Sequence, residues 1–86
     1  MMKNKRVKIE FYHIEFEALK ANSMISGTCG KYLASSEKHG DYIVLDLSIH
    51  EANELVGWVA GEANHSESEE EGDLLNSACD AIEAQI

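Results

Sequence analysis

The residues of this chain that could do chemistry are two cysteines, four histidines, sixteen carboxylates and one short segment rich in glycine. That segment, GTCGKY at residues 27–32, invites comparison with a phosphate-binding loop. Such a loop needs four residues between its glycines and a serine or threonine after its lysine. Here only two residues separate Gly27 from Gly30, and Tyr32 follows the lysine. The segment therefore predicts a bent strand or a turn rather than a nucleotide site.

Metal ligation is weakly supported by the spacing of the candidate ligands. The four histidines are scattered, and Cys29 and Cys79 lie fifty positions apart, so that no helix or knuckle brings ligands together. His50 and Glu54 have the i, i+4 spacing that is typical of a solvent-side contact. The acidic run at residues 67–73 lacks the alternating pattern and the glycine placement of a calcium loop. We expect no metal site and no cofactor.

Cys29 is the first candidate for a nucleophile. Nothing in the sequence places a histidine beside it to form a thiolate pair, and a buried structural cysteine is the commoner fate. Clustered carboxylates form a solvated acidic face by default. We therefore expect no catalytic residues, reduced thiols and a protein that is not an enzyme. An enzyme or metal-binding protein that uses Cys29 or the histidines is the third of our hypotheses.

Charge is distributed very unevenly along the chain. All seven lysines and arginines lie in the first 38 residues, where four acidic residues leave a balance of +3. Residues 39–86 hold twelve acidic side chains and no basic ones, so the whole chain carries −9. A segment that repels itself this strongly must stay solvated or face something positive. Duplex DNA would be repelled at this net charge, so we expect no direct binding to nucleic acid.

Length and composition predict one acidic domain that spans residues 1–86. Its 44% hydrophobic and 27% charged residues are typical of a folded chain. A signal-peptide core is not expected, because the basic start is soon followed by Lys8 and Glu10. No run approaches the roughly 18 apolar residues that cross a bilayer. We therefore expect a cytoplasmic protein that makes no use of a membrane.

The hydrophobic pattern predicts an α+β fold in which a small antiparallel sheet of about three strands comes first. Residues 5–19 alternate, with a change of parity after Phe11, which predicts one strand with a bulge. The alternative for the end of this segment is a short helix over residues 15–21. Residues 24–34 predict a weak second strand that is bent by glycine. Residues 42–47 predict the third strand.

Two helices are expected to follow and to pack on one face of the sheet. The first, over residues 48–63, begins with the Ser-x-x-Glu pattern of a capping box at residues 48–51. The second, over residues 67–85, can be capped by Ser66 or by Ser68. In each helix the apolar residues fall on one stripe, as expected for a helix that covers a core.

The leading functional hypothesis is a non-enzymatic module whose acidic helical half binds a basic protein surface, such as that of a nucleic-acid-binding protein. In size and charge alone, the chain is similar to small phage- or plasmid-borne inhibitors of the anti-CRISPR and anti-restriction type. That similarity implies a mimic of nucleic-acid charge that blocks its partner. The expected partner-binding residues are Glu51, Glu54, Trp58, Glu62, Glu67, Glu69, Glu70, Glu71 and Asp73.

The alternative hypothesis is a small homodimeric accessory protein in which acidity serves solubility only. Gly57 and Gly61 each weaken the first helix by about 1 kcal/mol relative to alanine. They also let another backbone approach closely, which favours a contact between helices of two copies. A chain of 86 residues gains stability from the additional burial.

Overall fold

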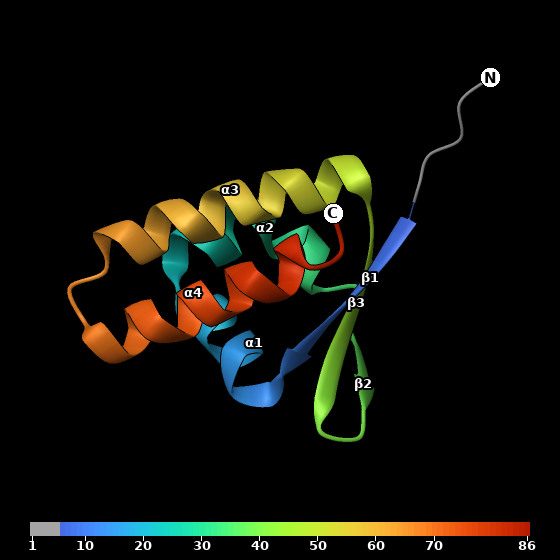
Figure 1. Cartoon of the computed structure of the whole chain (residues 1–86), viewed down its shortest axis with the longest axis horizontal. Helices are drawn as coiled ribbons and strands as arrows, with labels where there is room; N and C mark the ends of the chain where they lie inside the picture. The colour runs from blue at the N-terminus through green and yellow to red at the C-terminus, as the bar shows by residue number, and fades with distance from the viewer. Residues whose placement is uncertain (1–5) are drawn as a thin grey trace.

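The sheet and the helices occupy two layers in the computed structural model of the chain, which describes residues 6–86 (Figure 1). Three strands form one sheet, and four helices lie on one side of it. The elements in chain order are β1 (Arg6–Tyr12), α1 (His13–Ala21), α2 (Ser23–Leu33), β2 (Glu37–His39), β3 (Tyr42–Ser48), α3 (Ile49–His65) and α4 (Glu69–Glu83).

The sheet is antiparallel, and β3 is its central strand in the order β1-β3-β2. The register of β1 and β3 runs from the pair Arg6 and Ser48 to the pair Tyr12 and Tyr42. The outer strand β2 contributes only three residues. Gly40 makes the tight turn from β2 to β3 with a φ of +63°, a conformation that glycine adopts without strain.

One face of the sheet is apolar and covered by the helices. Ile9 and Phe11 of β1 are fully buried there, beside Ile43, Leu45 and Leu47 of β3. The residues between them point to the other face, which is polar and largely exposed. This alternation is typical of an antiparallel sheet with one face packed on the core and the other in solvent.

The expectation of a single bulged strand over residues 5–19 is wrong. The strand ends at Tyr12, and α1 begins at His13, so the change of parity after Phe11 marks a strand-to-helix transition. Phe16 and Leu19, three residues apart, both enter the core from α1. The Glu15 carboxylate accepts a hydrogen bond from the Tyr12 amide at 2.8 Å, which satisfies one amide at the helix start. The helical alternative for this segment was right.

The predicted strand over residues 24–34 is also wrong, because this segment is the helix α2. The Asn22 side chain caps it by accepting a hydrogen bond from the Ile25 amide at 2.9 Å. Ile25, Cys29 and Leu33 recur at helical spacing and are buried. The backbone departs from helical geometry at Cys29 (φ −111°, ψ 16°), so α2 is kinked there. The third strand of the sheet is instead β2, a short segment for which no strand was predicted.

The α+β class and the three-stranded antiparallel sheet are confirmed, as are both later helices. At the start of α3, the Ser48 hydroxyl accepts a hydrogen bond from the Glu51 amide at 3.1 Å, and the Glu51 carboxylate accepts one from the Ser48 amide at 2.9 Å. Ser68 caps α4. The helices α3 and α4 run antiparallel as a hairpin (Figure 1) and bury Leu55 and Leu75 in the shared core.

Candidate partner-binding surface

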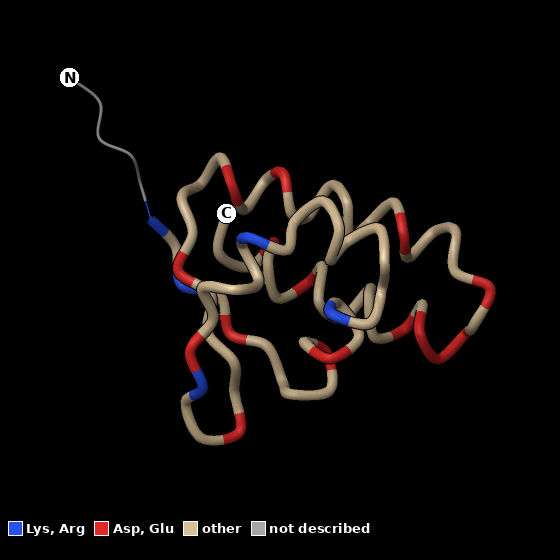
Figure 2. The backbone as a smooth tube through the Cα atoms, turned by 180° about the vertical axis from the view of Figure 1, so that it is seen from behind, with Lys and Arg blue, Asp and Glu red and all other residues tan. Residues whose placement is uncertain are grey.

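Basic and acidic side chains are separated in space as well as in sequence. The described lysines and arginines belong to β1, α1, α2 and β2, and none belongs to α3 or α4. Figure 2 shows acidic residues, and no lysine or arginine, at the far end of the α3–α4 hairpin. The residues of this end, here called the acidic tip, are Glu67, Glu69, Glu70, Glu71 and Asp73.

Most of the acidic tip faces solvent. Glu67, Glu69, Glu70 and Asp73 are exposed, and within residues 6–86 their side chains make no hydrogen bond or ion pair. Among the residues of the acidic tip, only the Glu71 side chain makes a hydrogen bond to the described chain, a bond that its carboxylate accepts from the Ser66 hydroxyl at 2.9 Å. The tip therefore presents several carboxylates that can meet a cation from outside.

Part of this acidity has a structural use. Glu69, Glu70 and Glu71 occupy the first turn of α4, where the helix dipole attracts negative charge. Each such contact is worth about 0.3–1 kcal/mol at low ionic strength. Glu67 and Asp73 lie outside that turn, so the helix dipole accounts for only part of the tip.

Three other predicted residues line one hollow on the outer side of α3. This open depression has a volume of about 440 Å³, and its lining includes Glu54, Gly57, Trp58, Gly61, Glu62 and His65. Gly57 and Gly61 add no side chain to the hollow, and a Cβ at either position would enter open space with no atom within 4 Å. Trp58 is half-buried: it packs against the core and also lines the hollow.

Both carboxylates of the hollow already make contacts that join α3 to the preceding elements. Glu54 accepts a hydrogen bond from the Tyr32 hydroxyl of α2, and this contact raises the pKa of Tyr32 to about 12. Glu62 accepts a hydrogen bond from the Asn22 side-chain amide at 3.2 Å. These bonds hold the two acids in place on either side of Trp58, although Glu54 remains exposed.

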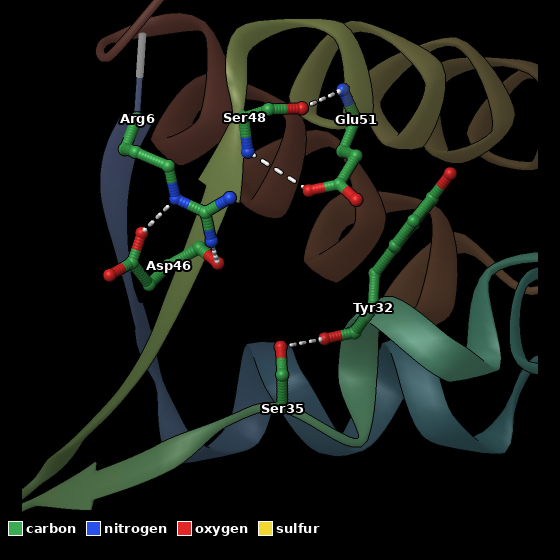
Figure 3. A network of polar contacts seen from close by, with 6 residues as sticks. All are labelled: Arg6, Tyr32, Ser35, Asp46, Ser48 and Glu51. Carbon is green, nitrogen blue, oxygen red and sulfur yellow. Dashed lines mark hydrogen bonds and ion pairs between the residues drawn. The ribbon is translucent and has the colours of Figure 1, made fainter. Parts of the chain in front are cut away.

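Glu51 is separated from the other candidates. It lies in the capping box at the start of α3 (Figure 3). At 1.5 Å of rise per residue, the acidic tip is roughly 20 Å away along the helix axis. On the neighbouring strands, the Arg6 guanidinium donates to the Asp46 carboxylate at 3.0 Å and to its carbonyl at 2.8 Å. The Glu51 carboxylate thus serves the helix start, and the structure does not bring it to the acidic tip.

The two cysteines are buried and free, on α2 and α4 respectively, as predicted for structural thiols. Burial raises the pKa of both thiols, to about 11 for Cys79. A thiol of this kind is protonated at neutral pH and is a poor nucleophile. Within residues 6–86, no group of three or more His, Cys, Asp or Glu side chains is arranged to hold a metal ion.

The open face of the sheet brings together residues that sequence reasoning did not select. It holds a hollow of about 330 Å³, lined by Lys8, Glu10, Ser35, Glu37, His39, Val44 and Asp46. The alternating polar residues of each strand could have indicated that this face is polar. Only the pairing register of the strands shows which of these residues become neighbours. Both signs of charge are present, so this hollow does not select a strongly charged ligand.

Comparison of the chain with protein-family models, with curated proteins and with solved structures finds no match. In the described part of the chain, no helix combines the length and the apolar character needed to span a bilayer.

Proposed function

We propose that this protein is a non-enzymatic binding module whose acidic tip engages a basic surface of another protein. The observation that carries the proposal is the charge of the α3–α4 hairpin, whose far end holds carboxylates without any lysine or arginine (Figure 2). A concentrated field of this kind raises association rates with a basic partner by about 10–10³-fold. It also resembles the phosphate array that nucleic-acid-binding proteins recognise, and blocking such a protein is the outcome that we propose.

The hollow on α3 extends this surface. His65 ends α3 and lines the hollow, while Glu67 begins the acidic tip two residues later, so the two regions are continuous along the chain. Trp58 gives the hollow an aromatic wall, and a partly exposed tryptophan is a common energetic anchor of protein interfaces. Glu54 and Glu62 beside it favour an arginine or lysine side chain from the partner. A cytoplasmic location belongs to the proposal and is supported by two buried, unpaired cysteines.

A second candidate function is the homodimeric accessory protein with a helix-to-helix contact. The open side of α3 at Gly57 and Gly61 supports it, because nothing there obstructs a second backbone. Glu54 and Glu62 flank that same strip and would approach their counterparts in the second copy. Like charges brought together cost free energy, so we favour a basic partner for this surface.

Two variants of equal net charge test the main proposal. The tip variant carries Glu67→Gln, Glu69→Gln, Glu70→Gln, Glu71→Gln and Asp73→Asn. The scattered variant carries Glu17→Gln, Glu37→Gln, Asp41→Asn, Asp80→Asn and Glu83→Gln. Each variant neutralises five carboxylates and changes the net charge from −9 to −4. Any difference between them therefore reports the position of the charge and not its amount.

Wild-type protein and both variants are immobilised and exposed to the same cell lysate at low salt, and bound proteins are eluted with salt and identified. We expect wild type and the scattered variant to retain the same basic protein, with affinity that falls steeply as salt rises. The tip variant should lose it. Equal retention by the tip variant, with circular dichroism showing intact folds, would eliminate the acidic tip as the contact.

A further inference from the structure

The two edges of the sheet are unequal. The edge strand β2 is three residues long, whereas β1 is seven residues long and pairs only with β3 within residues 6–86. A long free edge exposes a row of unpaired amide and carbonyl groups, which is a template for another strand. β1 is thus the place where this sheet can be extended.

The backbone of β1 shows which amides face outward. The Tyr12 amide donates to the Glu15 carboxylate at 2.8 Å, so it points away from β3. Amide direction alternates along a strand of an antiparallel pair, so the amides of Lys8 and Glu10 point the same way. A second strand that pairs with this edge would form its hydrogen bonds at Lys8 and Glu10.

The side chains of β1 are complementary to those of a second, antiparallel copy of the same strand centred on Ile9. In that register Ile9 lies opposite Ile9, and Val7 opposite Phe11, on the helix-covered side. Ile9 and Phe11 are already fully buried beneath the helices, so the complementarity comes from the polar side of the strand. On the open side, Lys8 faces Glu10, and these opposite charges attract. At the ends of the strands, the exposed Arg6 lies opposite Tyr12, a residue that is 55% exposed, and a guanidinium is attracted to the face of such a ring.

Neighbouring registers lack this complementarity. A shift of two residues in one direction places Lys8 opposite Lys8, and a shift in the other direction places Glu10 opposite Glu10. Like charges directly opposite one another destabilise a strand pair. A shift of one residue would place the apolar side of one strand against the polar side of the other. The register centred on Ile9 keeps the apolar sides of both strands together and places no like charges directly opposite one another.

We propose that two copies of this chain associate through β1, antiparallel and centred on Ile9, so that their sheets form one continuous sheet with all helices on the same side. The position of β1 limits repulsion between the two acidic molecules. The strand carries Arg6, Lys8 and a single acid, and it lies at the end of the molecule opposite the acidic tip (Figure 1). Charges separated by more than roughly 8 Å are largely screened at physiological salt. The assembly leaves both acidic tips exposed and does not depend on the function proposed for them.

Charge exchange along β1 tests the register, with sedimentation equilibrium of the full chain as the readout. Wild type should approach twice the 9.5 kDa mass of the chain as concentration rises. Lys8→Glu and Glu10→Lys each place like charges opposite one another and should weaken association about tenfold or more. The double variant Lys8→Glu/Glu10→Lys restores opposite charges and should associate like wild type. A mixture of the two single variants should also associate, because every acid then faces a lysine of the other chain.

The matched control is Glu83→Lys, which makes the same charge change on α4 and should leave association unaltered. Hydrogen exchange of wild type gives a second measurement that needs no variant. The Lys8 and Glu10 amides should exchange slowly at high concentration and quickly at low concentration. A wild-type chain that stays monomeric at high concentration overturns the proposal. So does a dimer that Glu10→Lys leaves unchanged, or one in which protection appears on α3 and not on β1.

Discussion

At the scale of single residues, Glu15 joins elements that are distant in sequence. It is the one charged side chain among residues 6–86 that is buried, with 6% of its surface exposed. One carboxylate oxygen accepts from the Tyr12 amide, and the other accepts from the Ser77 hydroxyl of α4. The same carboxylate thus caps α1 and connects α1 to α4. A buried polar group of this kind is tolerated because its partners satisfy it.

Replacement of Glu15 by alanine should therefore destabilise the fold. The Tyr12 amide and the Ser77 hydroxyl would lose their partner, and a hydrogen bond to a charged group contributes about 1.5–3 kcal/mol. Glu15→Gln keeps an acceptor oxygen and should cost less. Urea denaturation measures both changes, and Glu17→Ala, an exposed neighbour on α1, is the control with an expected effect within about 0.5 kcal/mol. Equal stabilities of Glu15→Ala and Glu17→Ala would contradict this role.

At the scale of elements, the glycines of α3 lower the stability of the helix but shape its outer surface. Gly57 and Gly61 lie inside a helix of 17 residues, where glycine is unfavourable. No neighbouring atom requires their small size, since a Cβ at either position meets nothing within 4 Å. Their absent side chains instead leave the hollow beside Trp58 open. The glycines therefore have no packing role within the described chain.

Gly57→Ala should raise the free energy of unfolding by about 0.8–1 kcal/mol, because alanine is the better helix former and the site has room. Gly40→Ala should do the opposite and cost about 1–2 kcal/mol, since its φ of +63° strains any side chain. Chemical denaturation of the two variants measures both changes in the free energy of unfolding, which should have opposite signs. If Gly57→Ala proves stabilising and also weakens capture of the basic partner, the hollow belongs to the interface. A destabilised Gly57→Ala would show that glycine is needed there for the fold itself.

At the scale of the whole molecule, the net charge of −9 opposes folding through self-repulsion. The five acids of the acidic tip are neighbours in sequence, so they repel one another in the unfolded chain as well. Their mutual repulsion largely cancels between the two states. Repulsion between distant parts of the chain, in contrast, grows when the chain becomes compact.

Stability should consequently rise with salt, which screens the repulsion between distant charges. The tip variant and the scattered variant, both at −4, should show a smaller rise than wild type and resemble each other. Thermal unfolding at several salt concentrations measures this. Binding of the basic partner, in contrast, should differ between the two variants. If the rise of stability with salt were lost only in the tip variant, the repulsion that opposes folding would come mainly from the acidic tip.

The sequence was sufficient to locate a helix or strand where the pattern that predicts it lies within a few consecutive residues. The capping pattern at Ser48 located the start of α3, and the alternation around Leu45 located β3. It failed over residues 13–33, where a change of parity resembles a bulged strand and Gly27 and Gly30 obscure the helical period. In this segment, tertiary packing determines that the chain is helical and not a strand, because Phe16, Leu19 and Ile25 fill the core only when their segments are helical.

The sequence by itself determined the α+β class, the uneven distribution of charge and the two later helices, because each of these follows from residues close together in the chain. Only the tertiary structure decided which charges share a surface. It separated Glu51 from the acidic tip, placed Glu54 against Tyr32 and left β1 as the long free edge of the sheet. The Tyr32–Glu54 contact joins residues 22 positions apart and the Glu15–Ser77 contact joins residues 62 positions apart, and the core has to be packed before either pair can meet.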